Sequence, residues 1–187
     1  ERAQGHSDPE GAPQATHASS SCGSRDEEDQ ESLGSRYPGW MSSRTTYDEV
    51  AYPSNPLSQA HPSLLAALGR LHGIDCPSPK RCRYLEVGCG TGRHLIGLAA
   101  RYPDSEFLGL DYAALPIETA TQRTRDLGLK NLRFLEADIR HLPDEVGAEW
   151  DFLVAHGVFS WVPEEARLGI LQAARDRLNP NGLAYIS

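Results

Sequence analysis

Short apolar runs alternate with amphipathic segments over most of the chain beyond residue 80. The apolar runs have the length and residue types of buried strands, and lie at 81–87, 106–110, 132–135, 150–155 and, after the turn sequence NPNG, 183–187. Between them, apolar positions recur at helical spacing over 93–101, 117–127 and 164–178. Strands that alternate with helices of this length indicate βαβ units. The pattern therefore predicts an α/β protein with a parallel sheet covered by helices.

The beginning of the chain has a different character. Ser, Gly, Gln, Pro and Ala dominate residues 1–45, which also carry the charged run RDEEDQE. Such a segment buries too little apolar surface to offset the entropy lost on ordering, so we expect a disordered low-complexity tail. Further on, leucines recur at helical spacing from Leu64 to Leu71, and Pro62 suits the first turn of that helix. We expect one folded domain over 46–187.

Composition narrows the classes of function. The formal net charge of -8 argues against a protein that coats nucleic acid, because phosphate binding requires a basic face. No stretch approaches the roughly 18 to 20 apolar residues of a membrane span. The four cysteines form no CxxC pair and have no histidine at zinc-finger spacing, so we expect neither a disulfide framework nor a metal site. Buried, reduced thiols in a cytoplasmic protein are the simplest interpretation.

A glycine loop follows the first predicted strand. Gly88, Gly90 and Gly92 alternate there, and Glu86 stands two places before them. Glycine permits a positive φ and a close approach to a ligand, and the helix that follows offers unpaired N–H groups at its N-terminus. The stretch predicts a nucleotide-like cofactor site, in which Glu86 approaches an amino group. The alternative is structural, since one glycine can serve turn geometry alone.

Acidic residues also follow the next two predicted strands. Asp111 ends the second strand, at the distance beyond the loop typical of an acid that holds ribose hydroxyls. Asp138 follows the third strand and could contact the exocyclic amine of adenine, with Ile139 against the ring. The carboxyl ends of parallel strands share one edge of the sheet, so these groups should meet. The alternative role for Glu86 or Asp111 is helix capping.

The spacing distinguishes between two kinds of cofactor. A dinucleotide fold requires glycine or alanine where this chain has Arg93, and the spacing here is ExGxGxG. LEVGCGTG, LGLDYA and EADI together resemble the motifs of class I S-adenosylmethionine-dependent methyltransferases. The resemblance implies a Rossmann-like class I methyltransferase fold, S-adenosyl-L-methionine as cofactor, and an enzyme that transfers methyl groups.

Flanking sequences extend the resemblance to about 46–187. YDEVAYPSNPLSQAHP, DFLVAHGVFSWVP and LNPNGLAYIS are similar to bacterial methyltransferases with a C-terminal regulatory domain, a group that includes lysine methyltransferases of outer-membrane proteins. This similarity implies a protein side chain, such as lysine, as methyl acceptor. It also implies a C-terminally truncated catalytic domain whose last strand is an open edge, and which need not be active as a fragment.

The acceptor pocket is expected beside the fourth predicted strand. Methyl transfer depends mainly on alignment of the nucleophile with the methyl carbon. His156, Phe159 and Trp161 follow that strand and are candidates to line the pocket, with Tyr47 from the N-terminal segment. His156 either assists deprotonation and orients the acceptor, or is a hydrogen-bonded histidine without a role in the reaction. For Trp161 the alternative is packing. A small-molecule methyltransferase and a non-catalytic cofactor-binding module remain open.

Overall fold

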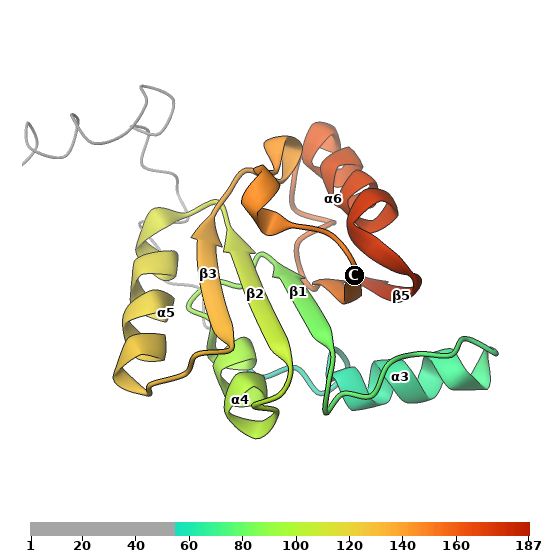
Figure 1. Cartoon of the computed structure of the whole chain (residues 1–187). Helices are drawn as coiled ribbons and strands as arrows, with labels where there is room; N and C mark the ends of the chain where they lie inside the picture. The colour runs from blue at the N-terminus through green and yellow to red at the C-terminus, as the bar shows by residue number, and fades with distance from the viewer. Residues whose placement is uncertain (1–54) are drawn as a thin grey trace, which may run out of the picture. The chain divides into compact units, whose positions relative to one another are not determined.

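The computed structural model describes residues 55–187; the predicted tail and Tyr47 lie outside the described residues. One sheet contains five parallel strands in the order β3-β2-β1-β4-β5 (Figure 1). The bounds are β1 Arg83–Val87, β2 Glu106–Asp111, β3 Leu132–Glu136, β4 Trp150–Ala155 and β5 Leu178–Ile186. The order of the strands in the sheet and their parallel pairing confirm the predicted Rossmann-like α/β class. Among the described residues, β5 pairs with β4 alone.

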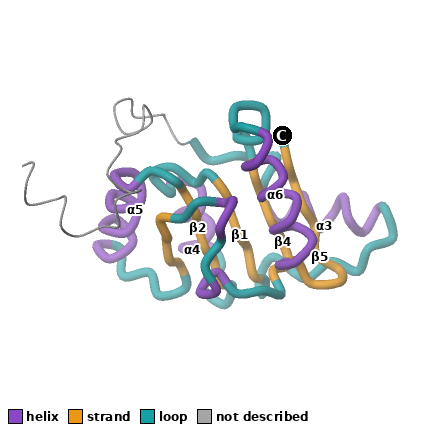
Figure 2. Tube along the Cα trace, turned by 90° about the horizontal axis from the view of Figure 1, so that it is seen from above, coloured by secondary structure: helices purple, strands orange, loops and turns teal. Residues whose placement is uncertain are grey.

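Helices cover both faces of the sheet (Figure 2). One face packs against α3 Pro62–Leu71, α4 Arg93–Arg101 and α5 Ala114–Asp126, and the other against α6 Glu164–Arg177 with the 3-10 turns η1 Ile139–His141 and η2 Asp144–Val146. Successive strand residues alternate between the two cores, so that Tyr84 belongs to the first and Leu85 to the second. Within residues 55–187, no helix has both the length and the apolarity needed to cross a bilayer.

The helix after β2 begins earlier than predicted. It starts at Ala114 instead of residue 117, and Pro116 lies inside its first turn. A proline is tolerated there because the first N–H groups of a helix have no intrahelical partner. The apolar pattern alone placed the start too late, because a proline interrupts it and the apolar Leu115 before that proline is exposed and not part of the core.

The last strand also differs from its prediction. It starts at Leu178, directly after α6, and contains the NPNG sequence that we interpreted as a turn. The ladder with β4 shifts register between Trp150 and Phe152, which accommodates the extra residues. The side chain of Asn179 donates to Asp151 and accepts from the Asn181 N–H at 2.9 Å. The predicted turn is therefore wrong: these residues form an irregularity within the strand.

A buried histidine joins the segment before α3 to the core. The Leu57 N–H donates to His94 Nδ1 at 3.1 Å, and His94 Nε2 lies 3.3 Å from the Tyr84 hydroxyl, which donates to the Ala60 carbonyl at 2.8 Å. The tyrosine oxygen must then accept from Nε2–H, so His94 is neutral. Burial, with smaller contributions from His61 and His156, lowers the pKa of His94 to about 4. The sequence offered no signal for this role.

Acidification should therefore weaken the fold through His94. The depressed pKa means that His94 contributes stability above the unfolded-state value near 6.5, and that this stability is lost as the pH falls towards 4. The free energy of unfolding should fall by about 2 to 3 kcal/mol over that range. Denaturant titrations of the protein and of His94→Gln measure it, with His72→Gln on the surface as the matched control. An unchanged pH slope in His94→Gln would contradict the assignment.

Candidate cofactor and acceptor site

The glycine loop between β1 and α4 is held in a conformation that side chains rarely adopt. Gly88 and Gly92 have φ values of 75° and 69°. A Cβ on Gly88 would lie 2.4 Å from Val158 Cγ2, and one on Gly92 would lie 2.2 Å from Phe134 Cζ. The loop therefore packs directly against the segment after β4 and against β3. Gly92 is buried, so its glycine is needed for packing, whereas the exposed Gly88 lies at the rim of the loop.

Asp111 fixes the loop from the end of β2. Its Oδ2 accepts from the Gly90 N–H at 2.8 Å, and its Oδ1 accepts from the Ala113 N–H at 3.0 Å. The first bond ties β2 to the glycine loop, and the second caps the turn into α5. Asp111 therefore ties the glycine loop to the start of α5, and its role as the acid that accepts ribose hydroxyls stays a prediction.

Glu86 is buried in the middle of the sheet. It pairs in register with Gly109 on β2 and with Val154 on β4, and its exposed fraction is 5%. Within residues 55–187 its Oε2 has no hydrogen-bond partner, although such an atom costs free energy when it is buried. Burial first, and then the charge of Asp111, raises the pKa of Glu86 to about 8. A buried acceptor next to a glycine loop fits a ligand that brings an ammonium group.

Asp138 caps the turn η1 after β3. Its Oδ1 accepts from the backbone N–H of Arg140 at 2.9 Å, and the Arg140 side chain donates from Nε and Nη2. These hydrogen bonds with Arg140 hold the pKa of Asp138 below its ordinary value. Ile139 packs at the edge of the second core. The sequence predicted Asp138 and Ile139 as cofactor-binding residues but did not predict the contact with Arg140. An arginine two places after an acid was a signal for such an ion pair.

His156 lies at the end of β4 and is oriented by β5. Its Nδ1 is 2.8 Å from the Ser187 hydroxyl, and its ring stacks on Tyr185 with centroids 6.0 Å apart. Phe159 packs against the second core, whereas Trp161 is 78% exposed, so its ring does not pack in the core of the described residues. Three of the four predicted acceptor residues are thus placed by the structure, and they follow the same strand.

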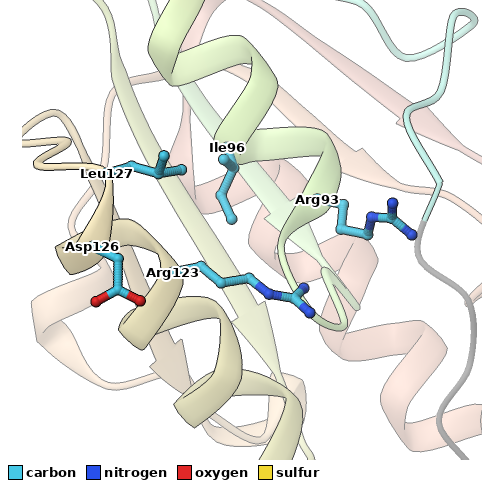
Figure 3. Close-up of a pocket in the computed structure, with 5 residues that line it drawn as sticks. All are labelled: Arg93, Ile96, Arg123, Asp126 and Leu127. Carbon is cyan, nitrogen blue, oxygen red and sulfur yellow. The ribbon is translucent and has the colours of Figure 1, made fainter.

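A groove between α4 and α5 lies apart from these residues (Figure 3). It has a volume of about 610 Å³ and is lined by Arg93, Ile96, Arg123, Asp126 and Leu127. None of the predicted cofactor or acceptor residues lines it. Arg93, which distinguished this loop from a dinucleotide fingerprint, lies at the edge of this groove, and its guanidinium points away from the other four side chains (Figure 3). The residues predicted to bind the cofactor follow the carboxyl ends of the strands instead.

The described residues contain no group of three or more His, Cys, Asp or Glu side chains that could hold a metal ion. Cys76, Cys82 and Cys89 are buried and unpaired, and burial raises the pKa of the Cys82 thiol to about 11. A thiol with a raised pKa is a poor nucleophile at neutral pH.

Known proteins are similar to this chain in sequence. Residues 85–184 match the model of the family described as "Methyltransferase domain", which is more than half of the chain. Two uncharacterized proteins of Rickettsia prowazekii (strain Madrid E) are each 38% identical, over 80% and 77% of this chain. The chain spans 27% and 57% of their respective lengths.

A solved structure is similar to this chain in both sequence and fold. PKMT2 from Rickettsia typhi in complex with AdoHcy superimposes with a TM-score of 0.68 at 33% identity, over 72% of this chain and 26% of that chain. The unpartnered Glu86 oxygen and the loop held by Asp111 fit the amino-acid and ribose parts of such a cofactor. S-Adenosyl-L-methionine is thus the cofactor of this domain. The chain belongs to the class I S-adenosylmethionine-dependent methyltransferases.

Proposed function

We propose that the protein transfers a methyl group from S-adenosyl-L-methionine to a protein side chain, with lysine as the acceptor. The observation that carries the proposal is the buried Glu86 carboxyl at the edge of the glycine loop, whose Oε2 lacks a partner in the part of the chain that the structure describes. Its environment suits a bound ammonium group. The protein acceptor is supported by the similarity of the flanking sequences to lysine methyltransferases and by the 33% identity with PKMT2.

Each residue of the site would bind a different part of the cofactor. Glu86 accepts the ammonium group, Asp111 accepts the ribose hydroxyls and Asp138 accepts the adenine amine, while Gly88 and Gly90 leave room for a close approach of the backbone. The bound cofactor supplies an electrophilic methyl carbon. Because the acceptor must be aligned with that carbon, positioning accounts for most of the rate enhancement that the protein can provide.

The acceptor would enter beside the end of β4. His156 has one ring nitrogen engaged with Ser187, so that the other can orient the acceptor or take up its proton. Phe159 and the exposed Trp161 would line the entrance, with Tyr47 arriving from outside the described residues. We also propose a cytoplasmic location, which three buried and unpaired cysteines favour.

The acceptor class is tested by methyl transfer itself. The full-length protein, incubated with labelled S-adenosylmethionine, should label proteins of a cell extract, and mass spectrometry should place the label on lysine. Labelling of a metabolite pool alone would favour a small-molecule methyltransferase. Cofactor binding without any transfer would show a non-catalytic binding module.

Cofactor binding should release a proton. Glu86 has a pKa of about 8 before binding, so it is mostly protonated at pH 7, and it must ionise to pair with an ammonium group. Calorimetry with S-adenosylhomocysteine in buffers of different ionisation enthalpy should show close to one proton released, about 0.9 from the titration of such a group. Glu86→Gln should release none and bind more weakly. The variant Glu118→Gln, at an exposed position, should behave like the unaltered protein. If the unaltered protein releases no proton when it binds S-adenosylhomocysteine, the role of Glu86 is refuted.

His156 should affect turnover more than cofactor affinity. His156→Ala removes a group that faces the acceptor, whereas the carboxylates that hold the cofactor stay in place. We expect turnover to fall by about 10²-fold or more, which is the lower range for general acid–base groups. The dissociation constant of S-adenosylhomocysteine should change little. His72→Ala on the surface is the control, and full turnover in His156→Ala would remove His156 from the mechanism.

A further inference from the structure

The turn η1, which carries Asp138 at its start, is in direct backbone contact with α6. A Cβ on Gly169 would lie 2.6 Å from the carbonyl oxygen of Ile139 and 3.2 Å from the backbone nitrogen of Arg140. Real Cβ atoms do not approach a carbonyl oxygen this closely, and backbone atoms cannot move aside as a flexible side chain can. Any larger residue at Gly169 must therefore displace η1.

Arg140 holds the same turn from within. Its backbone N–H, Nε and Nη2 all donate to Asp138, with Nε 2.9 Å from both oxygens. The side chain of Asp138 is only 11% exposed, whereas that of Arg140 is 43% exposed. A carboxylate that accepts from three donors on one neighbour cannot rotate freely. Its remaining acceptor capacity points in a fixed direction.

We propose that Gly169 and Arg140 are positioning residues that fix Asp138 for selective recognition of the adenine base. The inference rests on the proposed cofactor site. A carboxylate accepts a hydrogen bond from the amine of adenine, but it repels the carbonyl oxygen that hypoxanthine has at the same place. Selectivity between the two bases therefore depends on where the carboxylate is held. Two residues that do not touch the base decide that position.

The experiment compares two probes, S-adenosylhomocysteine and S-inosylhomocysteine, by calorimetry with the full chain. The unaltered protein should prefer the adenine compound. Gly169→Ala and Arg140→Ala should each reduce this preference by about tenfold, which corresponds to the loss of one hydrogen bond. A loss of general packing would weaken both probes equally and leave the ratio unchanged.

Matched controls come from the same chain. Gly97→Ala changes a helical glycine of α4 whose Cβ would meet no atom within 4 Å. Arg175→Ala removes an exposed arginine that pairs with the neighbouring Asp176. Both controls should keep the unaltered preference. Thermal unfolding of each variant shows whether it is folded, and if Gly169→Ala does not fold, Arg140→Ala decides the question.

The outcomes distinguish the positioning role from the cofactor site itself. If Asp138→Asn loses the preference but folded Arg140→Ala and Gly169→Ala keep it, the positioning role is overturned and the cofactor site stands. If Asp138→Asn also keeps the preference, the base is recognised elsewhere and the inference fails. If the unaltered protein binds neither probe, the proposed function itself fails.

Discussion

The central position of β1 is the constraint on which the site depends. This strand lies between β2 and β4, and its register places Glu86 beside Gly109 on one side and Val154 on the other. Parallel pairing aligns the carboxyl ends of the strands, so the loops that follow them meet at one edge. A single strand therefore brings the glycine loop, Asp111 and His156 to the same edge of the sheet.

That arrangement costs stability in the absence of a ligand. Glu86 is held among buried residues with one oxygen unpartnered, and its raised pKa records the free energy of keeping its charge there. Stability linked to this group is fully present below the unfolded pKa, and is lost as the pH rises towards 8. His94 has the opposite sign, because burial favours the neutral form of both groups, and that form is deprotonated for histidine but protonated for glutamate. The two groups oppose each other where their titrations overlap.

Residues outside the recognisable motifs position the side chains and segments around the site. His94 fastens residues before α3 to the core, and Ser187 with Tyr185 orients His156. Asp138 depends in the same way on the contact between α6 and η1. These supports bring together residues that are distant in sequence, so the motifs supply the groups that bind while the rest of the fold sets their geometry.

The sequence by itself determined the class of fold, the alternation of strands and helices, and the identity of the groups at the strand ends. These features follow from local periodicity and from the spacing of glycines and acids, which are both encoded in neighbouring residues. Most strand and helix boundaries agree within two residues, as for α4 and β4. Errors arose where tertiary contacts override local signals: the NPNG sequence became part of β5 because its side chains bond to β4 and within the strand.

Only the tertiary structure decided which residues support the site. The partners of His94, the contact of Gly169 with η1 and the unpartnered oxygen of Glu86 all depend on elements from different parts of the chain packing together. Burial and hydrogen bonding across such distances leave no periodic trace in the sequence. They decide the charge of Glu86 and His94, because a pKa depends on the whole environment of a group and not on its neighbours in the chain.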